Sequence, residues 1–215
     1  METLDASVIA TALPAMARSL GEAPLALSLA ITSYLLSLAV FIPISGWMAD
    51  RFGGRSVFRA AILVFMAGSV ACGVAGSLAE LVGARILQGA GGAMMVPVGR
   101  LILLRTVPKA GLLRAMAFVT IPALVGPVIG PPLGGLIATY ASWRWIFLIN
   151  VPIGIVGVVL VSLLIPNRVA DAGRPLDGRG FVLAGTGLAG LMFGLEALGR
   201  ATLPWPVVAG LIGGG

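Results

Sequence analysis

Long apolar stretches alternate with short polar or charged turns along the whole chain. The stretches lie near residues 3–20, 24–48, 57–76, 79–104, 112–138, 145–165 and 180–199, and an eighth begins near residue 205 and runs to residue 215. As a helix, each full stretch is about long enough to cross a hydrocarbon layer of roughly 30 Å, because a helix rises about 1.5 Å per residue. The pattern therefore predicts an all-α, polytopic membrane protein.

The composition supports this prediction and argues against nucleic acid as a partner. Apolar residues make up 59% of the chain, charged residues 10%, the mean hydropathy is +1.08 and there is no His, which excludes an ordinary soluble globule. The net charge is +6, but the basic residues sit in short turns rather than in a patch with aromatic residues, so we do not expect nucleic acid as a partner. The single cysteine, Cys72, lies within an apolar stretch and is interpreted as a packing residue.

Basic residues gather in alternate turns. One set of turns holds Arg51, Arg55, Arg59, Arg105, Lys109, Arg114, Arg168, Arg174 and Arg179, whereas only Arg18, Arg144 and Arg200 flank the opposite ends of the spans. Cytoplasmic loops of membrane proteins carry an excess of Lys and Arg. We therefore expect a multi-pass protein of the cell inner (plasma) membrane, with the lipid bilayer as its surroundings and the amino terminus in the cytoplasm.

The first three spans share a sparse pattern with the next three. Five pairs keep one constant offset, and two further pairs align the earlier helices: Pro43/Pro132, Gly46/Gly135, Ala49/Ala138, Arg55/Arg144, Phe58/Phe147, then Pro14/Pro97 and Asp5/Gln88. An odd number of crossings turns the second copy upside down, the inverted-repeat arrangement of secondary transporters. We therefore expect a 3+3 inverted repeat over residues 1–165, a cytosolic loop over 166–179, and one further helix with part of another over 180–215.

The charged turn GWMADRFGGRSVF resembles the signature loop of the major facilitator superfamily. Five residues match the family pattern: Gly46, Asp50, Arg51, Gly53 and Arg55. Met48 and Gly54 depart from it, because the family prefers Leu and a basic residue there. The resemblance implies a six-helix amino-terminal bundle in which this loop acts as a gate, with its arginines reaching acids or carbonyls of the partner half. The alternative is that Arg55 and Arg59 only fix topology against anionic lipid.

The first span reads LDASVIATALP and resembles the start of the 14-span drug:proton antiporter family within this superfamily. A charged carboxylate in hydrocarbon is costly, so it tends to pair, to face water or to take up a proton. Asp5 is therefore the candidate proton site. The alternative is an ordinary solvated acid at the cytosolic interface.

The fourth span, LVGARILQGAGGAMMVP, resembles the family motif RxxQGxGAA through Arg85 and Gln88, which share a helix face. A guanidinium within a bilayer needs a carboxylate, a carbonyl or water, and Asp5 is the expected partner, which makes these residues the proton-coupling set. The predicted span boundaries place Arg85 nearer the outer face than Asp5, which argues against direct contact. The alternative is that Arg85 reaches the outer interface beside Glu80.

The fifth span, GPVIGPPLGG, resembles an antiporter motif reported mainly from exporters, GxxxGPxxGG. The motif is filled by Gly126, Gly130, Pro131, Gly134 and Gly135. Glycines four residues apart stack on one face of a helix, where a neighbouring helix can approach closely. The resemblance implies export, and the alternative is generic packing of small residues.

Two further segments and one acidic residue carry weaker signals. The aromatics of the family-like segment WRWIFLINVP, residues 143–152, suit a belt at the outer interface, so we assign the segment to anchoring. The GTGLAG stretch over 185–190 lies inside an apolar span with no preceding strand, so a dinucleotide site is rejected. Glu196 is a candidate binding residue for cationic substrates, or an interfacial acid beside Arg200.

Together these features predict a secondary active transporter that couples proton entry to the export of small drug-like or amphipathic compounds. No cofactor or metal is expected beyond the proton gradient. The alternatives are a metabolite or sugar importer of the same superfamily, or a non-transporting fragment. An enzyme is disfavoured, because the sequence has no His, no Ser/His or Cys/His set and no metal-ligand cluster. We expect the chain to be incomplete, with the carboxy-terminal half of the transporter missing.

Overall fold

The computed structural model describes residues 2–166, 175–200, 207 and 210–211, with side chains described for these residues other than 195–200. Within this part of the chain the regular structure is helical, and no strand occurs. The elements in order are α1 (Glu2–Leu20), α2 (Ser28–Phe41), η1 (Ile42–Ile44), α3 (Ser45–Phe52), α4 (Gly54–Val74), α5 (Leu78–Thr106), η2 (Lys109–Gly111), α6 (Leu112–Tyr140), α7 (Trp145–Leu148), α8 (Asn150–Leu164) and α9 (Gly178–Arg200).

Five helical stretches of the described chain are long and apolar enough to cross a membrane. They are Ser28–Phe52, Gly54–Val74, Leu78–Thr106, Lys109–Tyr140 and Trp145–Leu164. The first of them joins α2, η1 and α3 into one span. The predicted fold class, an all-α polytopic membrane protein, is confirmed.

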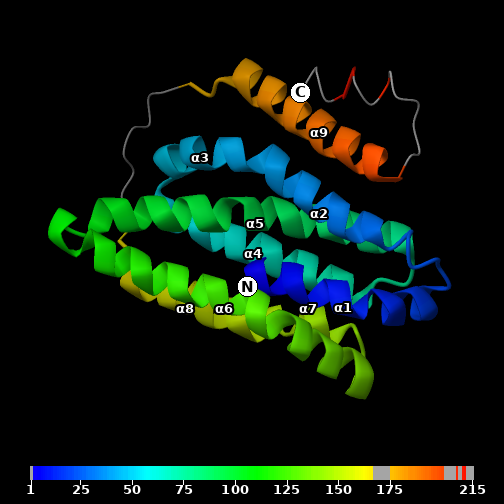
Figure 1. Cartoon of the computed structure of the whole chain (residues 1–215). Coiled ribbons are helices and arrows are strands. Elements are labelled where there is room, and N and C mark those ends of the chain that lie inside the picture. The colour runs from blue at the N-terminus through cyan, green and yellow to red at the C-terminus, as the bar shows by residue number, and fades with distance from the viewer. Residues whose placement is uncertain (1, 167–174, 201–206, 208–209, 212–215) are drawn as a thin grey trace.

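The helices lie side by side along a common direction and form layers (Figure 1). Helix α4 packs along α5, α2 packs on α5, and α1 packs on α6. Helix α9 lies on the outer side of α2, away from α6 and α8 (Figure 1). Helix α1 begins midway along α5, so its first turn lies level with the middle of α5 rather than with one of its ends (Figure 1).

Local sequence signals set two of the helix boundaries. The hydroxyl of Ser77 accepts a hydrogen bond from the Glu80 amide at 3.2 Å, and the Glu80 carboxylate accepts one from the Gly76 amide at 2.7 Å. This reciprocal arrangement resembles a capping box and starts α5. Gly53 separates α3 from α4 with a φ of +84°, a conformation that side chains disfavour.

Small residues let the helices approach closely in the core. A Cβ at Gly91 of α5 would lie 2.5 Å from the Phe65 backbone nitrogen of α4, and one at Gly68 of α4 would lie 2.6 Å from the Gln88 backbone. Backbones that approach this closely gain dispersion energy along the whole contact. The α4–α5 pair therefore forms a rigid platform that carries Gln88 and, one turn before it, Arg85.

Candidate functional site

A buried ion pair joins α1 to α5. Arg85 Nη1 donates to Asp5 Oδ2 at 2.5 Å, and both side chains have no exposed surface. The guanidinium also donates through Nε to the Ala30 carbonyl of α2 at 3.0 Å. Because two opposite charges are held together inside an apolar bundle, neither can lose its partner without a large desolvation cost.

Gln88 completes the pairing as both an acceptor and a donor. Its Oε1 accepts from Arg85 Nη1 at 2.6 Å, and its Nε2 donates to Asp5 Oδ1 at 3.0 Å. Nε2 also donates to the Ser69 hydroxyl of α4 at 2.7 Å, and the Cys72 thiol faces Oε1 at 3.7 Å. The structure thus brings together the three residues that the sequence singled out for proton coupling.

Two interpretations from the sequence are wrong at this site. Asp5 is not a solvated acid and Arg85 does not reach an interface, since both side chains are fully buried. Glu80, the alternative partner of Arg85, instead caps the start of α5. Asp5 and Arg85 are in direct contact in spite of the predicted span boundaries, because helix lengths do not fix how far one helix is shifted along another, and α1 begins midway along α5 (Figure 1).

Sequence reasoning missed several members of the cluster, among them Asn150 and Tyr34. Asn150 of α8 donates through Nδ2 to Asp5 Oδ1 at 3.2 Å and is fully buried. The ring of Tyr34 from α2 lies 4.0 Å from the guanidinium carbon of Arg85, a cation–π distance. A lone amide at the start of a long apolar helix was the available signal for Asn150, because polar groups in membrane spans tend to be functional.

The segment that carries Asn150 is not an exposed aromatic belt. Trp143 is 5% exposed and Phe147 is fully buried in the apolar core, while Trp145 is the exposed aromatic of the segment at 57%. The anchoring interpretation is therefore wrong for the two buried aromatics. Their burial follows from packing against α1 and α4, which holds Asn150 against Asp5.

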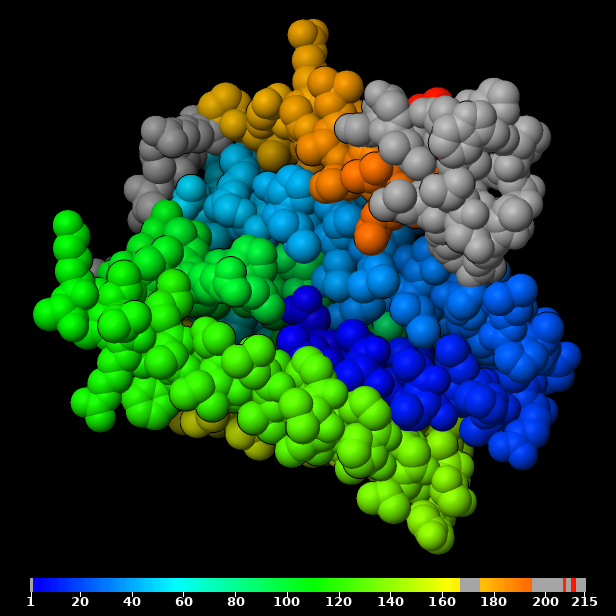
Figure 2. Space-filling view, in the orientation of Figure 1, coloured from blue at the N-terminus to red at the C-terminus, as the bar shows by residue number. Residues whose placement is uncertain are grey.

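The glycine face of α6 carries α1. Gly126, Gly130 and Gly134 are buried, and a Cβ at each would overlap α1 atoms: Thr3 at 2.8 Å for Gly126, the Ser7 side chain for Gly130, and the Val8 carbonyl at 2.6 Å for Gly134. The Ser7 hydroxyl also donates to the Gly126 carbonyl at 3.2 Å. The side chains of α1 and α6 lie directly against each other in Figure 2.

The other two residues of that motif lie away from this contact. Pro131 is exposed, and a Cβ at Gly135 would meet nothing within 4 Å. The close approach of α1 therefore uses the glycines spaced by four.

The charged turn makes its described ion pair within the bundle. Asp50 Oδ1 accepts from Arg105 Nη2 at 2.6 Å, with the two side chains 39% and 36% exposed. This pair ties α3 to the end of α5.

Gly46 has open space where a Cβ would lie, whereas a Cβ at Gly54 would lie 2.9 Å from Ile102 of α5. Gly54 therefore replaces the family's basic residue at a point of close helix contact.

Arg51 and Arg55 of the same turn lie at the α3–α4 junction, exposed and partly buried respectively. The contacts predicted for these two arginines with a carboxy-terminal half stay a prediction. Glu196 lies in α9, and its side chain is outside the described residues.

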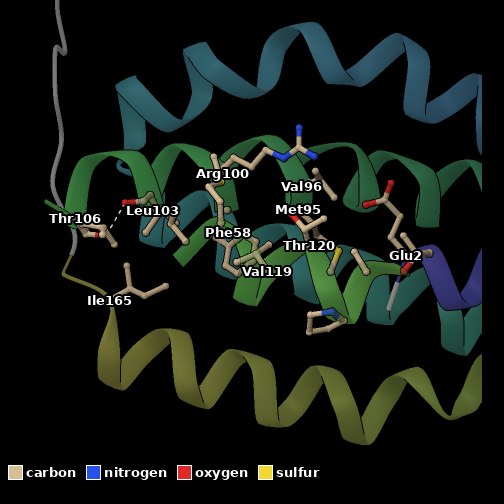
Figure 3. Close-up of a pocket in the computed structure, with 17 residues that line it drawn as sticks. Glu2, Phe58, Met95, Val96, Arg100, Leu103, Thr106, Val119, Thr120 and Ile165 are labelled. Carbon is tan, nitrogen blue, oxygen red and sulfur yellow. Dashed lines mark hydrogen bonds between the residues drawn. The ribbon is translucent and has the colours of Figure 1, made fainter. Parts of the chain in front are cut away.

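A cavity of about 550 Å³ lies between the start of α1, the second half of α5 and the first half of α6. Its lining is mainly apolar, with Phe58, Met95 and Val119 among the side chains drawn in Figure 3. Glu2 and Arg100 are the charged residues that line it, and in Figure 3 the Arg100 side chain extends along α5 toward the Glu2 end of the cavity. Glu2 is three residues before Asp5, so helix α1 carries both a residue that lines the cavity and the acid of the buried ion pair.

Comparison with known proteins agrees with the motifs. The family model of the Major Facilitator Superfamily matches residues 1–215. MdtD multidrug resistance proteins of Salmonella typhimurium, Salmonella paratyphi B and Salmonella newport are each 49% identical over 216 residues. The match covers 100% of this chain and 46% of each relative, so the chain spans about half the length of the curated relatives that it matches.

Proposed function

The chain belongs to the major facilitator superfamily, and we propose that it forms the amino-terminal part of a proton-coupled exporter of amphipathic, drug-like compounds. The MdtD relatives are named multidrug resistance proteins, which supports export of drug-like compounds by this chain as well. We place the protein in the inner (plasma) membrane with its amino terminus in the cytoplasm, on the distribution of basic turns. Asp50, Arg51 and Arg55 serve in this proposal as a cytosolic gate against the carboxy-terminal half.

The buried Asp5–Arg85 pair carries the proposal. A guanidinium does not release its proton, so Asp5 is the member of the pair that can change charge. When Asp5 binds a proton, the ion pair becomes a neutral acid beside an unpaired cation, and the arrangement of α1 against α5 loses much of its electrostatic stabilisation. Proton binding can therefore favour a second arrangement of the helices, which is what coupling to a gradient requires.

The contact between α1 and the glycine face of α6 would allow α1 to move in this way. Helix α1 carries Asp5 and packs on Gly126, Gly130 and Gly134 with little side chain between the backbones. A smooth contact of this kind allows one helix to shift along another without displacing bulky groups. We propose that α1 moves on α6 when Asp5 changes charge.

The cavity is the proposed path for the apolar body of the substrate. Its volume suits a drug-sized molecule, and its apolar lining with a few charged groups is typical of small-molecule sites. Glu2 supplies a negative charge for a cationic substrate group. Because Glu2 and Asp5 lie on the same helix, a substrate bound at Glu2 and a proton bound at Asp5 would both act on α1.

Dye efflux from cells tests this function. Cells that express the full-length transporter from its own gene, loaded with ethidium, are expected to lose the dye when energised and to retain it when a protonophore collapses the gradient. Asp5→Asn should abolish efflux while membrane expression stays at the wild-type level. Efflux that survives Asp5→Asn would remove Asp5 from the mechanism, and gradient-driven dye uptake would indicate an importer.

A further inference from the structure

We propose that Asn150 is a positioning residue that partners the Asp5 carboxyl group in both of its protonation states. The proposal rests on the proton-coupled function proposed above and adds a residue of α8 to it. The observation behind it is a buried hydrogen-bond acceptor on Asn150. Asn150 donates through Nδ2 to Asp5 Oδ1 at 3.2 Å, while its own Oδ1 is buried and has no hydrogen-bond partner within the described chain.

The other hydrogen-bond partners of Asp5 are suited to its charged form. Arg85 can only donate, so it has nothing to offer the proton of a neutral acid. Gln88 uses Oε1 to accept from Arg85 and uses Nε2 to donate to Asp5 and Ser69. Accepting the proton of a neutral Asp5 would require Gln88 to give up its bond with Arg85.

Tyr34 and Glu2 are the competing candidates, because the Tyr34 hydroxyl and Glu2 Oε2 are also buried without a hydrogen-bond partner within the described chain. Glu2 lies near Asp5 on the same helix, but no hydrogen bond joins the two carboxyl groups. The Tyr34 hydroxyl lies on a side chain that contacts Arg85, and no hydrogen bond joins this hydroxyl to Asp5. Asn150 already contacts the carboxylate oxygen in question. Among these unpartnered acceptors, the Asn150 amide oxygen is the one whose side chain already forms a hydrogen bond with Asp5.

The exchange needs only a rotation of one amide. The terminal torsion of an asparagine is roughly two-fold, so a half turn exchanges Nδ2 and Oδ1 in space. A proton that arrives from water binds Asp5 Oδ1, the Nδ2 hydrogen bond to this oxygen is lost, and the new O–H donates to Asn150 Oδ1. Release of the proton to water reverses the steps, so Asn150 partners either form without a helix having to move.

The surroundings of Asp5 contain few other charges. The titratable or charged groups near it are Glu2 on its own helix, Tyr34 from α2, Cys72 from α4 and Arg85 from α5. Helices α7 and α8 contain no charged residue, and the charged residue of α6, Arg114, lies at its far end over Phe118. The polar group that α8 places against Asp5 is therefore the Asn150 amide.

The test is the pH profile of ethidium efflux by the full-length protein. Asn150→Leu keeps the approximate shape and removes both donor and acceptor. We expect half-maximal efflux to move to higher pH by roughly 0.5–1 unit, because the carboxylate loses a charge-assisted bond, which is stronger than the neutral bond that the acid loses. Asn150→Gln, which retains the amide, should return the profile toward wild type. Ser162→Ala removes a hydroxyl of α8 that, within the described chain, donates to the Val158 carbonyl; it is the matched control and should leave the pH profile unchanged.

The proposal is overturned if the Asn150→Leu protein keeps the wild-type pH profile of ethidium efflux. If that variant does not reach the membrane folded, Asn150→Asp decides instead, because two carboxyl groups in contact would share a proton and shift the profile to still higher pH, whereas an unchanged profile overturns the proposal. Failure of the proposed function is distinguishable, since it would appear as wild-type protein without gradient-dependent efflux, or as efflux that survives Asp5→Asn.

Discussion

The guanidinium carbon of Arg85 lies 4.0 Å from the centre of the Tyr34 ring, so the cation contacts an aromatic ring as well as the carboxylate of Asp5. Phe147 presents a second ring to the same cation at 5.8 Å. Attraction between a cation and a ring is larger where water is excluded, and all three side chains are fully buried. The aromatic face therefore helps to hold Arg85 in place when Asp5 is neutral.

Replacing Tyr34 separates the ring from its hydroxyl. Tyr34→Phe keeps the ring over Arg85 and should retain stability and efflux close to wild type, because the hydroxyl has no partner within the described chain. Tyr34→Leu removes the cation–π contact and should lower the free energy of unfolding by about 2 kcal/mol or more. Thermal unfolding in detergent measures the difference, and equal stability of the two variants would contradict it.

Removing one member of the buried ion pair should cost more than removing both. Arg85→Met leaves the Asp5 carboxylate buried without its cation, and we expect a loss of about 3–5 kcal/mol. The double variant Asp5→Leu with Arg85→Met should recover most of this stability, because no uncompensated charge remains. Unfolding of the single and double variants in detergent forms a double-mutant cycle, and additive losses would show that the pair is not coupled. Efflux should be absent in the double variant in spite of its stability.

Two glycines of α6 form a matched pair for the helix contact. Gly130→Ala should destabilise the protein by about 1–3 kcal/mol and reduce export, because the new Cβ overlaps the Ser7 side chain of α1. Gly135→Ala should stabilise it by roughly 0.5–1 kcal/mol, since a Cβ there meets nothing within 4 Å and alanine is the better helix former. Effects of the same sign in the two variants would mean that the contact with α1 is not what the glycines provide. Gly130→Leu should stop export completely.

The pair between Asp50 and Arg105 should matter for transport more than for stability. Both side chains are more than a third exposed, so water screens the attraction, and Arg105→Gln should change the free energy of unfolding by less than about 1 kcal/mol. If the turn gates the cytosolic side, Asp50→Asn should nevertheless reduce efflux, and exchanging the two charges should restore part of it. A large loss of stability from Arg105→Gln would assign the pair a structural role instead.

Residues that share one helix were well predicted from the sequence. Arg85 and Gln88 were assigned to one face from a spacing of three, and both contact Asp5. Gly126, Gly130 and Gly134 were assigned to a close-approach face from a spacing of four, and α1 lies on it. These assignments depend on helical periodicity, which the order of residues fixes by itself.

Contacts between distant segments were not predictable in the same way. Asn150 and Asp5 are 145 residues apart, and the sequence placed the segment of Asn150 at an interface. The Arg105 partner of Asp50 and the cavity beside Glu2 also depend on which helices are neighbours.

The sequence by itself determined that this protein is a bundle of membrane-length helices and which faces of those helices carry polar or small residues. A continuous run of about 20 apolar residues crosses lipid as a helix, because a helix satisfies every backbone polar group within its own segment. Only the tertiary structure decided how far each helix is shifted along its neighbours. That shift is the sum of many weak contacts from several helices at once, and it is what sets Asp5 at the depth of Arg85, Gln88 and Asn150.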